Sequence, residues 1–115
     1  MEFQTNAQPI FMQIYDLLCD RVLSGQLQPE QQIPSVRELA VQLEVNPNTV
    51  MRTFEYLQVN EIIYNRRGMG FFVAQDAREQ ILQLHKLTFL TEELPYLLQR
   101  MKLLGLTLDD LQQYF

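Results

Sequence analysis

The sequence predicts a mainly α-helical fold with one small β-hairpin, followed by a short helical tail. Helix-spaced apolar residues recur through residues 9–60, and two short apolar runs around a glycine-bearing turn follow them. From residue 76 onward, leucines are dense on more than one helix face. These observations divide the chain into a predicted domain of residues 1–75 and a predicted tail of residues 76–115.

Length and composition fit a small globular protein. The chain has 115 residues, of which 47% are hydrophobic and 20% are charged. No apolar run of about 18 residues occurs, so no membrane span is expected. The polar first residues lack the order of a signal peptide. We therefore expect a cytoplasmic protein.

Few side chains are available for catalysis or for binding a metal. Cys19 is the only cysteine and His85 the only histidine, which makes a zinc site or a Ser-His-Asp triad hard to assemble. Cys19 lies in an apolar helical pattern, which indicates a buried thiol. Helix N-termini explain the acidic pairs at 92–93 and 109–110. We expect no enzyme, no cofactor and no metal.

The first helix is expected to begin near Pro9, because proline suits a first helical turn, and to be capped by Gly25. A loop of residues 26–34 follows, with Leu27 and Ile33 as its apolar tethers. The apolar stripe of the helix consists of Ile10, Ile14, Leu17, Leu18 and Val22.

Two further helices are indicated by their N-terminal caps. Ser35 and Glu38 have the spacing of a capping box, which places the start of the second helix at Ser35. Asn46 followed by Pro47 combines a strong N-cap with a proline at the first helical position. The third helix is therefore expected to start there.

The third helix has two chemically different sides. At about 100° per residue, Asn48 and Arg52 project from the side opposite the apolar one, with Thr49 on a flank. The apolar side is expected to be buried and consists of Val50, Phe54 and Leu57. Such an outer face has the side chains that can read a DNA groove.

A β-hairpin is predicted after the third helix. Two apolar runs, residues 62–65 and 71–74, flank the turn of residues 66–70 (RRGMG). Two helices joined by a short turn and followed by a hairpin have the order of a winged helix-turn-helix. In that fold the second helix of the pair enters the major groove of DNA.

The tail has more apolar surface than about forty residues can bury alone. A second copy of the chain is the economical partner. Pro95 is expected to kink or interrupt the path, with a new helix start at residues 91–93, and Gly105 to end a helix. The predicted dimerisation residues are Leu84, Leu87, Leu90, Leu94, Leu97, Leu98 and Met101.

Several motifs resemble those of GntR-type regulators. Residues 33–40 (IPSVRELA) resemble the family's helix-two signature, and residues 45–50 (VNPNTV) resemble the helix-three start of its YtrA-type branch. Residues 66–73 (RRGMGFFV) resemble the family wing, and the short tail is similar to the YtrA-type dimerisation segment. The resemblance implies a repressor that binds an inverted-repeat operator in double-stranded DNA as a homodimer, often beside an ABC-transporter operon.

The resemblance also implies which residues contact DNA, and their chemistry agrees. Arginine can grip guanine or phosphate, asparagine can pair with adenine, and glycine lets the backbone approach closely. Two positions depart from the family pattern: Glu30 stands where glycine is usual, and Met69 where a basic residue is common. The predicted DNA-binding residues are Ser35, Arg37, Asn48, Thr49, Arg52, Arg66, Arg67, Gly68 and Gly70.

Ordinary surface roles remain alternatives for these residues. Arg52 has Glu55 one turn away, Arg37 has Glu38 and Glu44 nearby, and Ser35 is a helix cap in any case. The net charge of −5 weakens attraction to phosphates. The alternative function is therefore a winged-helix protein-interaction module that has lost operator binding. Whether a small-molecule effector exists stays open.

Overall fold

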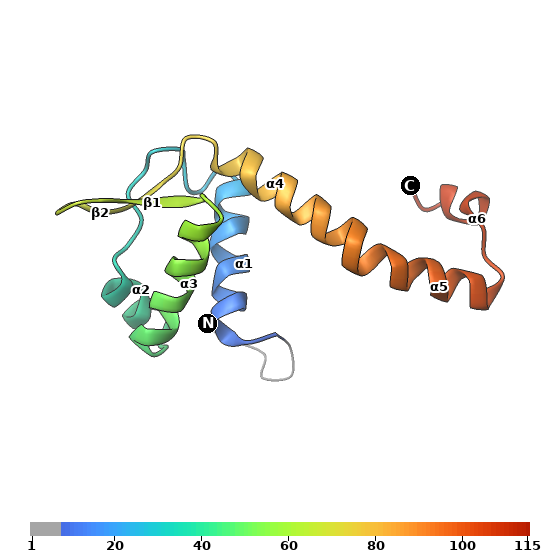
Figure 1. The fold of residues 1–115 in the computed structure, drawn as a ribbon, viewed down its shortest axis with the longest axis horizontal. Coiled ribbons are helices and arrows are strands. Elements are labelled where there is room, and N and C mark those ends of the chain that lie inside the picture. The colour runs from blue at the N-terminus through green and yellow to red at the C-terminus, as the bar shows by residue number, and fades with distance from the viewer. Residues whose placement is uncertain (1–7) are drawn as a thin grey trace. The chain divides into compact units, whose positions relative to one another are not determined.

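The computed structural model describes residues 8–115 and confirms a mainly helical winged helix-turn-helix with a two-stranded antiparallel wing (Figure 1). The chain divides into two compact units, Met1–Ile81 and Leu82–Phe115. The predicted boundary at residues 75/76 falls in the turn before α4. The elements are α1 (Ile10–Leu23), α2 (Val36–Leu43), α3 (Pro47–Val59), β1 (Ile63–Arg66), β2 (Gly70–Val73), α4 (Ala77–Thr88), η1 (Phe89–Glu93), α5 (Leu94–Leu104) and α6 (Leu108–Gln112).

The core of the first unit lies between α1 and α3, which pack side by side (Figure 1). The apolar stripe predicted for α1 points inward at Ile14, Leu18 and Val22, while Ile10 at its start is 41% exposed. Phe54 of α3 is fully buried, as are its predicted neighbours Val50 and Leu57. Because the apolar side of α3 is used in this way, its opposite side faces outward.

Both predicted N-terminal caps are present. Ser35 Oγ accepts a hydrogen bond from the Glu38 amide at 3.1 Å, and the Glu38 carboxylate accepts one from the Ser35 amide at 3.2 Å. Asn46 Oδ1 accepts a hydrogen bond from the Asn48 amide at 2.8 Å, with Pro47 as the first residue of α3. These caps satisfy amides that helix starts leave unpaired, so they fix where α2 and α3 begin.

The wing is shifted by one residue from the prediction. β1 and β2 pair from Ile63 with Val73 to Arg66 with Gly70, so Arg66 and Gly70 belong to the strands instead of the turn. The extra pair forms because the turn closes tightly, with the Met69 amide donating to the Arg66 carbonyl at 2.8 Å. The turn itself is therefore shorter than the five residues predicted.

The loop before α2 joins the wing along its outer strand. The Ile33 amide donates to the Phe71 carbonyl at 3.0 Å, and the Val73 amide donates to the Gln31 carbonyl at 2.9 Å. Leu27 and Ile33 are buried, as expected of tethers. The wing is thus held to the body of the domain by backbone bonds as well as by its own hairpin.

The second unit is helical, and of the two outcomes expected at Pro95, a kink or an interruption, the interruption is wrong. The backbone stays helical through a π-helical segment, η1, and continues into α5. Proline has no amide hydrogen to donate, and the wider turn accommodates this: the Leu94 amide reaches back five residues to the Phe89 carbonyl. The acidic pair at 92–93 lies at the end of this segment, and Glu93 is the N-cap residue of α5.

The end of the second unit follows the prediction. Gly105 ends α5 in the left-handed conformation with φ of 71°. Thr107 and Asp110 then form a capping box that starts α6. Within residues 8–115, no helix combines the length and the apolarity that crossing a bilayer requires.

Candidate nucleic-acid interface

The outward side of α3 carries the side chains that the sequence assigned to groove reading. Asn48 and Arg52 are exposed, and Thr49 is half-buried. At the start of α2, Ser35 and Arg37 are exposed as well. Only Thr49 is partly covered by the described part of the chain, so the surface needed for DNA contact is available. Their contacts with DNA stay a prediction.

Arg52 has a partner that the sequence did not suggest. Its guanidinium carbon lies 4.0 Å from the centroid of the Phe11 ring, which comes from the first turn of α1. Within residues 8–115, Arg52 makes no ion pair with Glu55. The alternative of a simple surface pair on α3 is therefore not what the structure contains.

A buried hydroxyl ties α3 to α1 at the same level. Thr53 is fully buried, and its Oγ1 lies 2.8 Å from the Phe11 carbonyl oxygen and 3.2 Å from that of Thr49. A buried hydroxyl must find such a partner, because leaving it unpaired is costly. The bond fixes the position of the outward face of α3 relative to the first turn of α1.

Arg66 is bound within the protein. Its guanidinium lies 2.9 Å from Glu30 Oε2 and 2.7 Å from Tyr64 Oη, and its charge lies over the Phe72 ring at 4.2 Å. Tyr64 also donates a hydrogen bond to Glu30. The hydrogen bond to Tyr64 and the nearby Glu30 carboxylate raise the pKa of Arg66. DNA contact by Arg66 stays a prediction, and this cluster competes with it.

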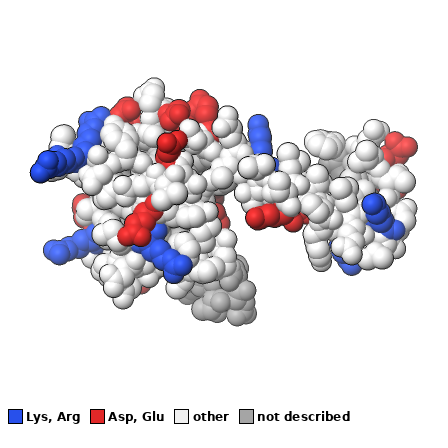
Figure 2. Space-filling model, in the orientation of Figure 1, with Lys and Arg blue, Asp and Glu red and all other residues white. Residues whose placement is uncertain are grey.

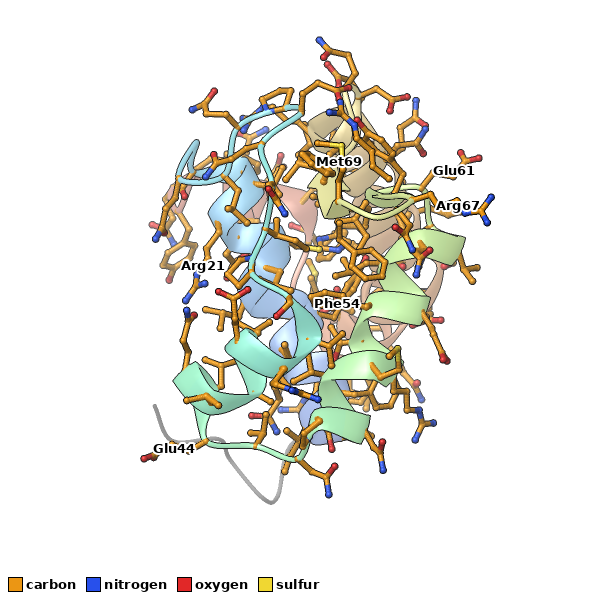
Figure 3. The ribbon with its side chains drawn as sticks, turned by 90° about the vertical axis from the view of Figure 1, so that its left-hand side faces the viewer. Arg21, Glu44, Phe54, Glu61, Arg67 and Met69 are labelled. Carbon is orange, nitrogen blue, oxygen red and sulfur yellow. The ribbon has the colours of Figure 1, made fainter. Side chains whose placement is uncertain are left out.

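The wing tip is exposed and apolar. Met69 is 58% exposed between two glycines of positive φ, Gly68 at 77° and Gly70 at 109°. Gln32 donates a hydrogen bond to the Met69 carbonyl at 2.6 Å. A Cβ on Gly70 would lie 3.0 Å from that Gln32 nitrogen, so glycine allows this close approach. In Figure 3, Met69 lies at the hairpin tip and Arg67 extends away from the body.

Several basic side chains of the first unit lie near the predicted interface. In Figure 2, two blue groups extend from the edge of the first unit that carries the hairpin and α2 in Figure 1, with red groups beside them. Within residues 8–115, neither Arg37 nor Arg67 forms an ion pair, and Glu38 is engaged in the helix cap. Local cations are therefore present despite the net charge of −5.

The single thiol of the chain does not form a competing reactive site. Cys19 is buried, as predicted, and burial raises the pKa of its thiol to about 12. Such a thiol is a poor nucleophile at neutral pH. In the described part of the chain, no three His, Cys, Asp or Glu side chains are grouped to hold a metal ion.

The predicted dimerisation residues differ in exposure. Leu87, Leu90, Leu97 and Leu98 are between 40% and 59% exposed, whereas Leu84 and Leu94 are half-buried. Met101 is 6% exposed and is thus covered by its own chain. Further exposed apolar residues of the second unit are Phe89, Tyr96, Leu103, Leu104, Leu106, Leu108, Tyr114 and Phe115. Their role in pairing two chains stays a prediction.

Comparison with known proteins decides the family. The family model described as "Bacterial regulatory proteins, gntR family" matches residues 11–73, which span α1 to the end of the wing. The chain belongs to the GntR family. As a GntR-family protein it is a DNA-binding transcriptional regulator and not an enzyme. Both the family and the fold expected from residues 33–40, 45–50 and 66–73 are confirmed.

Short GntR-family regulators match nearly the whole chain. The HTH-type transcriptional regulator YhcF of Bacillus subtilis is 38% identical over 110 residues, which cover 96% of this chain and 88% of that protein. The HTH-type transcriptional repressor YtrA of the same organism is 31% identical over 109 residues, covering 95% and 83%. The similarity therefore includes the tail as well as the winged domain.

Solved structures agree with these relatives. A GntR-family regulator from Bacteroides thetaiotaomicron has a TM-score of 0.80 and 47% identity, with 91% of each chain covered. The DNA-binding domain of AraR, solved in complex with operator ORR3, has a TM-score of 0.55 and 25% identity over 64% of this chain and 93% of that one. GntR-family DNA-binding domains of this fold thus bind operator DNA.

Sequence reasoning missed the residues that support the interface from behind. Phe11 under Arg52, Glu30 beside Arg66, and Gln32 at the wing tip are far from their partners in the chain, whereas Tyr64 lies two residues before Arg66 on β1. The departure of Glu30 from the family pattern is a signal for its pairing with Arg66, and the spacing of two residues along a strand puts Tyr64 and Arg66 on one face. No local pattern points to Phe11 or Gln32.

Proposed function

We propose that this GntR-family regulator is a repressor that binds an inverted-repeat operator as a homodimer. The observation that carries the proposal is the outward side of α3, where Asn48 and Arg52 are exposed while the apolar side of the helix is buried. In a helix-turn-helix, the first turns of this helix meet base edges in the major groove.

Each predicted contact residue has a proposed role. Arg52 and Asn48 read bases, because arginine can pair with guanine and asparagine with adenine through two hydrogen bonds. Thr49 and Arg37 contact phosphate oxygens, and Ser35 lies at a helix start that attracts anions. The wing backbone at Gly68 and Gly70 approaches the minor groove, with Arg67 on phosphate. Arg66 contributes only where DNA displaces Glu30.

The second unit supports the homodimer. A helical segment of 34 residues leaves Leu87, Leu90, Leu97 and Leu98 at least 40% exposed. Exposed apolar surface of this extent favours an interface with another protein surface. A second copy of the chain supplies one with two-fold symmetry, and two recognition helices then reach successive major grooves about 34–36 Å apart.

The names of relatives support repression. YtrA and NagR of Bacillus subtilis are both named transcriptional repressors, and the latter is 36% identical over 86 residues. A repressor acts by occupying its operator, so no further chemistry is required of this chain. We place the protein in the cytoplasm with its DNA.

The direct test is selection of bound sequences from a pool of duplexes with about 20 random base pairs, enough for two half-sites one helical turn apart. The full-length chain should enrich an inverted repeat. Arg52→Ala should weaken binding to the enriched duplex by about 1–3 kcal/mol, and Arg67→Ala should weaken all duplexes alike. Arg100→Ala, which removes one cation from the second unit, is the matched control. It should leave binding to the enriched duplex and to all other duplexes unchanged.

The alternative function is a winged-helix protein-interaction module. The net charge of −5 and the pairing of Arg66 with Glu30 favour it, because both weaken attraction to phosphates. If no duplex is enriched at low salt, the operator proposal is overturned and this alternative takes its place.

A further inference from the structure

We propose that Phe11 is a positioning residue for base recognition, because its ring forms the surface on which the Arg52 guanidinium is held for its groove contact. The inference rests on the proposed function and adds a residue from outside the helix-turn-helix. The juxtaposition of a ring from the first turn of α1 and an exposed arginine of α3, 4.0 Å apart, carries it.

The contact suits a guanidinium that must also bind DNA. Arginine lies on aromatic faces through its flat, delocalised surface and keeps its five N–H donors for other acceptors. An ion pair with Glu55 would instead occupy those donors. The Phe11 ring therefore restricts where the Arg52 side chain lies without using the groups that read a guanine.

The ring is itself held by a row of aromatic contacts. Phe11 meets Tyr56 edge-on with centroids 6.3 Å apart, and Tyr56 meets Tyr15 edge-on at 4.9 Å. Tyr15 is 3% exposed and belongs to the core. The Phe11 carbonyl also accepts a hydrogen bond from the Thr53 hydroxyl at 2.8 Å. The position of Arg52 is thus coupled to the core through α1.

Fixing the side chain in advance bears on specificity. A free arginine side chain loses rotamer freedom when it binds, and this loss offsets part of the gain from two hydrogen bonds to guanine. Holding it near the binding geometry reduces that loss for the correct base. Without the ring, Arg52 still adds positive charge, but it discriminates less between base pairs.

The test compares ring variants on the duplex that the wild-type chain selects from the random pool. The position read by Arg52 is the one at which Arg52→Ala flattens the base preference. There, Phe11→Leu should lower the preference about 2–5-fold, whereas Phe11→Tyr, which keeps an aromatic face, should retain it. In the Arg52→Ala background, Phe11→Leu should have no further effect.

Phe71→Leu is the matched control. Phe71 is also half-buried and packs edge-on against Phe54 at 5.0 Å, away from Arg52. It should leave the preference at the Arg52 position unchanged, and thermal unfolding measured by circular dichroism checks that each variant is folded. The inference would be overturned if Phe11→Leu kept the full base preference at the Arg52 position, or if it lowered that preference equally in the wild-type and Arg52→Ala backgrounds. A wild-type chain that selects no sequence would overturn the proposed function itself.

Discussion

Replacing Glu30 with glycine is expected to change the free energy of unfolding very little, whereas replacing Glu44 with glycine should raise it. Both residues have left-handed backbones, with φ of 66° and 56°. Both side chains are exposed, so neither replacement opens a cavity. The two positions differ in what the carboxylate does: Glu30 binds Tyr64 and Arg66, while Glu44 has no side-chain partner among residues 8–115.

The expected magnitudes follow from these contacts. A left-handed backbone costs an L-residue about 1–2 kcal/mol, and the greater freedom of glycine in the unfolded chain takes back about 0.5–1 kcal/mol. Glu44→Gly should therefore stabilise by about 0.5–1 kcal/mol. Glu30→Gly has the same gain but loses the hydrogen bond from Tyr64, worth about 1 kcal/mol, and an exposed ion pair with Arg66 that contributes little, so that gain and loss nearly cancel.

Urea unfolding followed by circular dichroism measures both variants. Equal stabilisation by Glu30→Gly and Glu44→Gly would show that the Glu30 cluster contributes nothing and would refute the reasoning.

The same two variants also give a prediction for DNA binding. Glu30→Gly releases Arg66, so the slope of log affinity against log salt should steepen by about 0.9, as for one added phosphate contact. Glu44→Gly should leave that slope unchanged.

Three further predictions concern the wing tip and the core. Met69→Arg should steepen the slope of log affinity against log salt by about 0.9, as for one new phosphate contact. An unchanged slope in DNA-binding titrations would place the wing tip away from the DNA backbone. Thr53→Val should destabilise by about 1–2 kcal/mol in urea unfolding, because the buried bond to the Phe11 carbonyl is lost; wild-type stability would contradict this. Burial raises the pKa of Cys19 from 9.0 to about 12, so the unfolded thiol ionises first and stability should fall as pH rises above about 9. The stability of Cys19→Ala should fall less steeply with pH than that of the wild-type chain. Equal slopes of stability against pH would refute the role given to the Cys19 thiol.

Local patterns in the sequence were sufficient for the helices and their starts. The capping box at Ser35 and the Asn46-Pro47 start each depend on residues within one turn, and both are present. The buried side of α3 followed from helical spacing alone. The family motifs then placed these elements in a winged helix-turn-helix. Prediction succeeded where the physical cause lies within a few residues.

Prediction failed where the cause lies elsewhere in the chain or in a rarer backbone geometry. The pairing of Arg66 with Glu30 escapes prediction because the two residues are 36 positions apart in the chain. The ring under Arg52 belongs to another helix, so helical spacing on α3 pointed to Glu55 instead. Pro95 predicts a kink or an interruption of the helix, but the chain stays helical because the wider turn of a π-helical segment accommodates the missing amide hydrogen. The left-handed backbone at Glu30 left only the departure from glycine as a signal.

Hydroxyl-radical footprinting on the selected duplex tests the central claim most directly. A homodimer that presents the outward side of α3 to DNA should protect two patches related by a two-fold axis, about one helical turn apart. Arg52→Ala should lose both patches at a concentration where the wild-type chain protects them. A single patch, or protection that is unchanged in Arg52→Ala, would contradict the account.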